Sequence, residues 1–182
     1  MKQAIFIFII LLIASCKSPE ARAPKANSIR SGSFLKESAE RNKQLNEAER
    51  KSIEQVILNQ NETYQTTKFG FWYRYTNKIE NDSVTPKFGD VVEFDYNISN
   101  LNGQLIYSKT ELGSQSYAMD QEELFSGLRE GLKLMKPSEE VIFIFPSHKA
   151  FGYYGDGKKI GRNTPIICEV TLTHINQKQN DE

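Results

Sequence analysis

The sequence predicts an α+β fold in which an antiparallel sheet packs against one helix. Residues 92–98 alternate apolar and polar side chains, which is typical of a strand with one face in water. Residues 141–146 and 165–176 contribute further β-prone runs, and the convincing helix of this half of the chain lies at residues 122–135. Four to six antiparallel strands with a helix across them make a layered α+β architecture.

The composition places the chain among ordinary globular proteins. Of its 182 residues, 25% are charged and 38% are hydrophobic, a balance that fits neither a disordered chain nor a bundle of membrane helices. The formal net charge is 0, so no basic field is present to gather nucleic acid, and we expect no nucleic-acid partner.

The first residues have the pattern of an export signal. Lys2 supplies a positive end and residues 4–14 form an apolar run, which at about 1.5 Å per residue spans roughly 16 Å of a hydrocarbon core about 30 Å thick. We therefore predict a signal peptide at residues 1–15. The tetrapeptide that ends in Cys16 resembles the bacterial lipobox, which predicts a lipidated Cys16 and a periplasm-facing lipoprotein of the outer membrane. The alternative is an ordinary signal peptide with an incidental cysteine.

A tether and a helix are expected between this signal and the sheet. Residues 16–33 are polar with Pro, Gly and Ser, and we interpret them as a flexible tether. Residues 34–60 are rich in helix formers, contain no Pro or Gly, and gather apolar residues only from Ile53 onward. Two interpretations stay open: a solvated helix that packs its last two turns on the domain, or an arm that forms a homodimer or binds a partner.

The remaining elements follow in order along the chain. Residues 69–75 are aromatic and β-prone, Asn102-Gly103 is a hairpin signal, and residues 105–107 begin the return strand. Residues 108–120 are typical of a loop or a bulged strand. In the helix at 122–135, the residues Leu124, Leu128, Leu132 and Met135 share one face, and residues 177–182 form a polar tail.

Several other chemistries find no support in the sequence. If Cys16 is acylated, Cys168 has no partner for a disulfide, and its place in an alternating strand favours a small core residue over a reactive thiol. The two histidines, His148 and His174, lack metal-ligand spacing with each other or with a cysteine, so we expect no metal and no cofactor. The four glycines between residues 152 and 161 favour loop turns rather than a phosphate loop.

Residues 69–176 resemble an FKBP-type peptidyl-prolyl cis-trans isomerase domain. The resemblance rests on the order and spacing of short motifs: Lys87-Phe88-Gly89-Asp90, Tyr96, Gly103, Gly127-Leu128-Arg129-Glu130-Gly131-Leu132, Met135, Pro146, Ala150-Phe151-Gly152 and Thr164-Pro165-Ile166. It implies a half-barrel sheet wrapped on one short helix. Together with the lipobox, the chain is similar to lipoprotein isomerases of the Bacteroidota envelope, especially the kind associated with gliding motility.

The resemblance also implies a reaction and a site. A prolyl bond rotates slowly because its amide resonance must break, with a barrier of about 18–20 kcal/mol, and a dry aromatic pocket favours the twisted transition state. The backbone N–H of Phe125 would hold the substrate carbonyl. The expected partners are proline-containing exported polypeptides. The implied catalytic residues are Tyr96, Ile106, Tyr107, Phe125 and Phe151, and the implied substrate-binding residues are Leu124, Leu128, Ile160 and Cys168.

The pocket departs from the family pattern at several positions. Leu128 stands where the family has a Trp floor, Tyr107 where it has an Asp, Phe151 where it has a Tyr, and Cys168 where it has a Phe. The Gly that the family has near Ser138 is also absent. Each lost polar contact would cost about 0.5–1.5 kcal/mol. The alternatives to an efficient isomerase are a proline-binding chaperone and a structural envelope component.

Overall fold

The computed structural model describes residues 27–80 and 84–178. The predicted signal peptide, Cys16 and the end of the polar tail lie outside the described residues. The chain divides into two compact units, one ending at Arg41 and the other beginning at Asn42, and the sheet belongs to the second. In the described part, no helix combines the length and the apolar character needed to cross a membrane.

The long helix α2 covers Asn27–Asn59 and so begins inside the segment that the sequence assigned to a tether. The prediction that the tether extends to residue 33 was therefore wrong at its end. No proline occurs between Pro24 and Pro86, so nothing sterically stops the helix before residue 34. Gly32 costs about 1 kcal/mol in a helix interior, which is not enough to end it.

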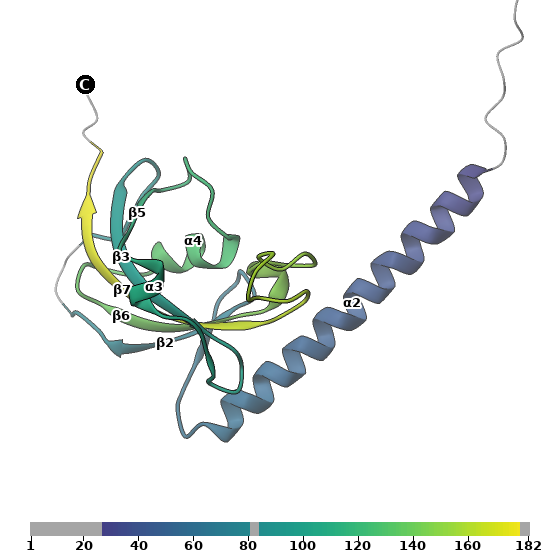
Figure 1. Ribbon diagram of the computed structural model, residues 1–182, viewed down its shortest axis with the longest axis horizontal. Coiled ribbons are helices and arrows are strands. Elements are labelled where there is room, and N and C mark those ends of the chain that lie inside the picture. Colours follow the sequence, from purple (N-terminus) through teal and green to yellow (C-terminus); the bar gives the residue numbers. More distant parts are fainter. Residues whose placement is uncertain (1–26, 81–83, 179–182) are drawn as a thin grey trace, which may run out of the picture. The chain divides into compact units, whose positions relative to one another are not determined.

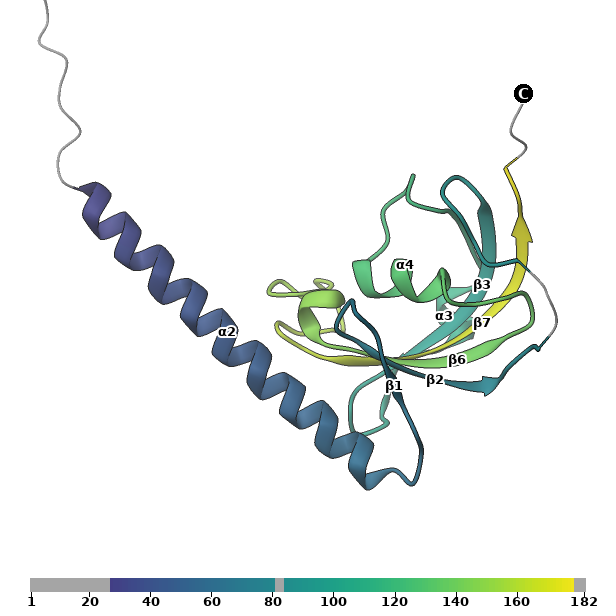
Figure 2. The same cartoon turned by 180° about the vertical axis from the view of Figure 1, so that it is seen from behind.

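Within the described residues, seven antiparallel strands form one sheet, in the order β1-β2-β6-β7-β3-β4, with β5 paired to β3. Figure 2 shows β1 and β2 at one side of this sheet, next to β6. The α+β class is confirmed, and the described sheet has more strands than expected because β1 is only two residues long and because residues 115–118 pair with β3. The strands are β1 Gln65–Thr66, β2 Trp72–Asn77, β3 Val91–Ser99, β4 Leu105–Tyr107, β5 Gln115–Ala118, β6 Glu140–Phe145 and β7 Ile166–Asn176.

Strand β3 has the one-sided burial that its alternation predicts. Its inward side chains Val92, Phe94, Tyr96 and Ile98 are all buried, and they meet β7 along its whole length. Strand β7 lies between β3 and β6, so that Cys168 faces Ile98 on one side and Phe143 on the other. The core therefore sits on the inner face of these central strands.

The short helix α4, Ser126–Leu132, lies across the inner face of the sheet (Figure 1). It is shorter than the predicted helix at 122–135, because the Glu122 carboxylate accepts a hydrogen bond from the Ala118 N–H at 2.9 Å and holds residues 122–125 in a loop. A Cβ atom on Gly127 would lie 2.5 Å from Cδ1 of Phe145. The helix therefore approaches the sheet at a distance that only glycine permits.

A second small core lies where α2 meets the sheet within the second unit. Ile53 is fully buried with Trp72 of β2 and Ile144 of β6. The Glu49 carboxylate accepts hydrogen bonds from the N–H of Ser147 at 2.8 Å and from its Oγ at 2.6 Å. These contacts agree with a helix that packs its last turns on the domain. The remaining helices are α3, Lys109–Leu112, and the 3-10 turn η1, Ser147–Lys149.

Candidate functional site

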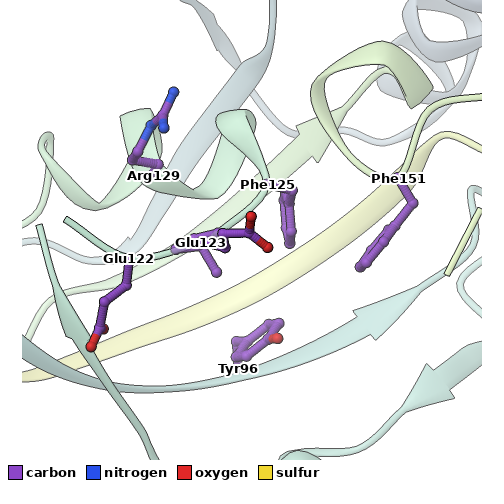
Figure 3. A pocket seen from close by; sticks show the side chains of 7 residues that line it. Tyr96, Glu122, Glu123, Phe125, Arg129 and Phe151 are labelled. Carbon is purple, nitrogen blue, oxygen red and sulfur yellow. The ribbon is translucent and has the colours of Figure 1, made fainter. Parts of the chain in front are cut away.

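A pocket of about 570 Å³ opens between β3, the loop before α4 and the loop after η1. Figure 3 shows the rings of Tyr96, Phe125 and Phe151 converging on it. The rings of Phe125 and Phe151 are 5.2 Å apart, centroid to centroid, and Leu124 completes the apolar wall. The pocket is therefore apolar at its base, as a site for a prolyl ring requires.

Local backbone geometry aims these side chains into the pocket. Phe125 is the residue before the first turn of α4 and has an extended backbone, with φ −62° and ψ 141°. Among the described residues, its N–H has no hydrogen-bond acceptor. Phe151 follows η1 and is succeeded by Gly152 with φ +62°, a left-handed turn that suits glycine. Phe125 thus offers one ring and one free donor at the same edge of the pocket.

Tyr96 brings a neutral hydroxyl to the pocket. Its side chain is only 8% exposed. Burial, with a smaller contribution from the nearby Cys168 thiol, raises the pKa of Tyr96 to about 12. The phenol therefore stays protonated at neutral pH and can donate a hydrogen bond to a bound carbonyl.

Three of the predicted binding residues lie below the pocket surface. Leu128 and Cys168 are fully buried and Ile160 is nearly so, and all three belong to the main core. Burial raises the pKa of the Cys168 thiol well above its usual range, so the thiol stays neutral. These residues shape the pocket from beneath, and their direct contact with substrate stays a prediction.

Tyr107 makes contacts with the loop at residues 155–160, and its predicted role in catalysis stays a prediction. Its hydroxyl donates a hydrogen bond of 2.5 Å to Asp156, whose other carboxylate oxygen accepts from the N–H groups of Lys158 and Ile160 at 2.8 Å each. The Lys159 ammonium lies 4.7 Å from the centroid of the Tyr107 ring and also bonds Glu111. We call Tyr107, Asp156 and Lys159 the loop anchor, because they fix residues 155–160 against β4.

The pKa values of Tyr107 and Asp156 agree with this geometry. The hydrogen bond to Asp156, with some desolvation, raises the pKa of Tyr107. Partial desolvation raises the pKa of Asp156, but the hydrogen bonds from Tyr107 and from the backbone outweigh it and hold this pKa below its ordinary value. Ile106, the neighbour of Tyr107 on β4, is half-buried and packs on the core. Neither Ile106 nor Tyr107 is among the residues that line the pocket.

The polar rim of the pocket was not anticipated as part of the site. Glu122, Glu123 and Arg129 line it together with the aromatic residues. The predicted helix at residues 122–135 would have placed the two glutamates in its first turn, and they reach the pocket because the helix begins later. The guanidinium of Arg129 is 3.5 Å from the carboxylate of Asp120. No group of three or more acidic, His or Cys side chains in the described part of the chain is arranged to hold a metal ion.

Comparison with known proteins places these features in one family. The family model for FKBP-type peptidyl-prolyl cis-trans isomerase matches residues 82–173. A probable FKBP-type isomerase, FkpA, of Neisseria meningitidis is 30% identical over 117 residues, which are 64% of this chain and 42% of that protein. A probable isomerase of Haemophilus influenzae is 27% identical over 114 residues, which are 63% of this chain and 46% of its own length. The chain thus spans less than half the length of these relatives.

Two solved structures share the fold. The crystal structure of FkpA from Escherichia coli has a TM-score of 0.60 at 21% identity, covering 97% of this chain and 82% of the other. An isomerase from Pseudomonas syringae has a TM-score of 0.58 at 21% identity, covering 72% of this chain and 96% of the other. This likeness confirms the FKBP-like α+β fold expected from the sequence.

Proposed function

The chain belongs to the FKBP-type peptidyl-prolyl cis-trans isomerase family, and from this premise we propose that it catalyses rotation about X–Pro peptide bonds in exported polypeptides. The observation that carries the proposal is the pocket in which Tyr96, Phe125 and Phe151 surround a space of about 570 Å³. The prolyl ring would enter between the three rings, with the residue before proline against Leu124.

Catalysis in this pocket would need neither a nucleophile nor a metal. The planar amide carries separated charge that the twisted transition state loses, so apolar walls favour the twisted form. The Phe125 N–H would hold the carbonyl of the substrate, and the Tyr96 hydroxyl is the second donor at hand. Each such hydrogen bond contributes about 0.5–1.5 kcal/mol where it is stronger in the transition state.

NMR exchange spectroscopy on a tetrapeptide that contains X–Pro tests this proposal. We expect faster cis–trans exchange than in buffer, with a preference for a bulky apolar residue before proline. The Phe125→Ala variant should bring the rate close to that of buffer, whereas Phe88→Ala, at an exposed residue outside the pocket, should not. Exchange at the buffer rate with the wild-type protein would contradict catalysis, and peptide binding without catalysis would favour the proline-binding chaperone.

We also propose that a lipid on Cys16 anchors the protein to the cell envelope, facing the periplasm and attached to the outer membrane. The lipobox resemblance supports this. Two or more acyl chains would hold a protein on a membrane durably. We expect Cys16→Ser to move the protein from the detergent phase to the aqueous phase of a Triton X-114 separation. Partitioning that survives the substitution would contradict lipid anchoring.

Two finer roles complete the proposal. The combination of the lipobox and the isomerase domain supports a role for the protein in folding components of a gliding-motility apparatus. In a deletion strain, the wild-type gene should restore gliding, whereas the Phe125→Ala gene should not.

A homodimer through residues 34–60 is supported by the exposed side chains of Phe34 and Leu35, each 65% exposed, and Leu58, which is 80% exposed. Sedimentation equilibrium of wild type and Leu58→Asp tests the dimer.

A further inference from the structure

A groove of about 180 Å³ lies between α2 and the loops around η1. Its walls come from Asn42, Leu45 and Asn46 on one side and from His148, Tyr153 and Asn163 on the other. All six residues belong to the unit that begins at Asn42 and includes the sheet. The groove is therefore a feature of one compact body.

Buried contacts hold the two walls of this groove in place. Ser147, at the start of η1, is 3% exposed and donates two hydrogen bonds to the Glu49 carboxylate of α2. One turn further along α2, Ile53 is fully buried against the sheet. The groove keeps its width because these contacts fix α2 against the loop.

The chemistry of the walls suits an extended polypeptide. Asn42, Asn46 and Asn163 present carboxamides, which both donate and accept hydrogen bonds and so complement a peptide backbone. Among the described residues, none of these three side chains has a hydrogen-bond partner, and the same holds for His148. Tyr153 is 58% exposed and offers an aromatic face of the kind on which proline-rich segments dock.

The groove continues from the pocket along the chain. Phe151 lines the pocket, and Gly152 and Tyr153, the next two residues, line the groove. Consecutive residues of one loop therefore border both hollows. The left-handed Gly152, with φ +62°, turns the backbone between them.

We propose that this groove binds the extended polypeptide segment next to the proline that occupies the pocket. The inference rests on the proposed isomerase function and specifies the substrate class as long, unfolded polypeptide rather than a short peptide. Backbone amides of the client would pair with the carboxamides of α2, and an apolar or prolyl side chain would lie on Tyr153. The groove would lower the KM for long substrates without entering the chemistry.

A comparison of two substrates tests the proposal on the full mature chain. A tetrapeptide reaches only the pocket, and a peptide of about 12 residues with the same central sequence also reaches the groove. We expect the double variant Asn42→Ala/Asn46→Ala to raise the KM of the long peptide about three- to tenfold, with its kcat and the tetrapeptide kinetics unchanged. Arg50→Ala, which removes only a helix ion pair with Glu54 at 3.6 Å, is the matched control.

A binding measurement keeps this test independent of turnover. The side-chain amide NMR signals of Asn42, Asn46 and Asn163 should shift with the long peptide and stay in place with the tetrapeptide. If the double variant fails to fold, Asn163→Gly, at a residue with φ +48°, removes a groove carboxamide from a position that glycine accepts. Equal KM values for both peptides in the wild type, or amide signals that do not shift with the long peptide, would contradict the proposal that the groove binds substrate. An inactive wild type with shifted amide signals would overturn the isomerase proposal alone.

Discussion

At the scale of single residues, the loop anchor explains a departure from the family pattern. The family resemblance places Tyr107 where the family has an aspartate. The sequence alone therefore suggests that the site has lost a carboxylate. In the structure Tyr107 donates a hydrogen bond to a different acid, Asp156, 49 residues further along the chain. An aspartate restored at position 107 would face a second carboxylate. We therefore expect Tyr107→Asp to weaken the site rather than to improve it.

The loop anchor leads to a prediction for Tyr107→Phe. The variant keeps the ring beneath Lys159 and removes only the hydroxyl, so residues 155–160 lose one of their ties to β4. We expect faster backbone hydrogen exchange in this loop and a several-fold lower kcat/KM on an X–Pro peptide. The control is Tyr73→Phe, which removes an exposed bond of 2.7 Å to Gln65 on the outer strands. Equal exchange in both variants would mean that Tyr107 does not restrain the loop.

A pH prediction follows from Tyr96. Its pKa of about 12 in the folded protein exceeds the ordinary value of 10.0, so folding favours the protonated phenol. The resulting stability is fully present below pH 10 and is lost as the pH rises from about 10 through about 12. We expect the ultraviolet absorbance of tyrosinate to show a late-titrating group that disappears in Tyr96→Phe. Tyr75, which shares a pKa of about 12, should still titrate late in that variant.

At the scale of elements, the sequence predicted strands better than it predicted helix ends. The alternation of β3 fixes which side chains point inward, because a strand has a period of two and its two faces meet different surroundings. Helix α4 began later than its pattern suggested because the Glu122 carboxylate bonds the Ala118 N–H, a contact between segments that periodicity does not report. The polar rim of the pocket was missed for the same reason.

Helix α4 gives a prediction about close packing. In an open helix, Gly→Ala stabilises by up to about 1 kcal/mol. At Gly127 the new Cβ would lie 2.5 Å from Phe145 Cδ1 and 2.8 Å from the Lys149 carbonyl oxygen, so we expect Gly127→Ala to destabilise the fold by about 1–3 kcal/mol. Urea unfolding measures this. Ser126→Ala on the same helix removes only a long hydrogen bond of 3.4 Å to the Lys149 carbonyl oxygen and should cost less, so an equal loss there would mean that close packing is not the cause.

Helix α2 gives a second prediction of this kind. Ile53 is fully buried with Trp72 and Ile144, whereas Leu58 on the same helix is 80% exposed. We expect Ile53→Ala to cost about 2–5 kcal/mol of unfolding free energy and Leu58→Ala to cost little in the monomer. Unfolding curves at low protein concentration compare the two. A comparable loss for Leu58→Ala would show that its side chain is covered in solution.

At the scale of the whole molecule, the order of motifs carried the fold assignment, since the spacing of Gly127, Pro146 and Phe151 along the chain reflects elements that must meet around one pocket. The sequence was less informative about α2. Its thin apolar stripe left open whether the helix stands apart or docks. The structure shows docking from Glu49 onward through the Glu49 carboxylate, Ile53 and Ile57, too few residues for a periodic signal.

The last prediction concerns how far α2 supports the domain. The contacts from α2 to the sheet and to η1 include those of Glu49, Ile53 and Ile57, all beyond Asn42, where the second unit begins. A chain that starts at residue 42 should therefore unfold at nearly the same urea concentration as a chain that starts at residue 27. A chain that starts at residue 60 should expose Trp72 and Ile144 and lose stability.

The single tryptophan makes this measurement direct. Trp72 is 8% exposed and packs in the same cluster as Ile53, so its fluorescence should shift to the red only in the shorter chain. The shorter chain should also lose the kinetic difference between long and short peptides, since Asn42 and Asn46 leave with the helix. A chain from residue 42 that is as unstable as the chain from residue 60 would assign the support of the domain to residues 27–41 instead.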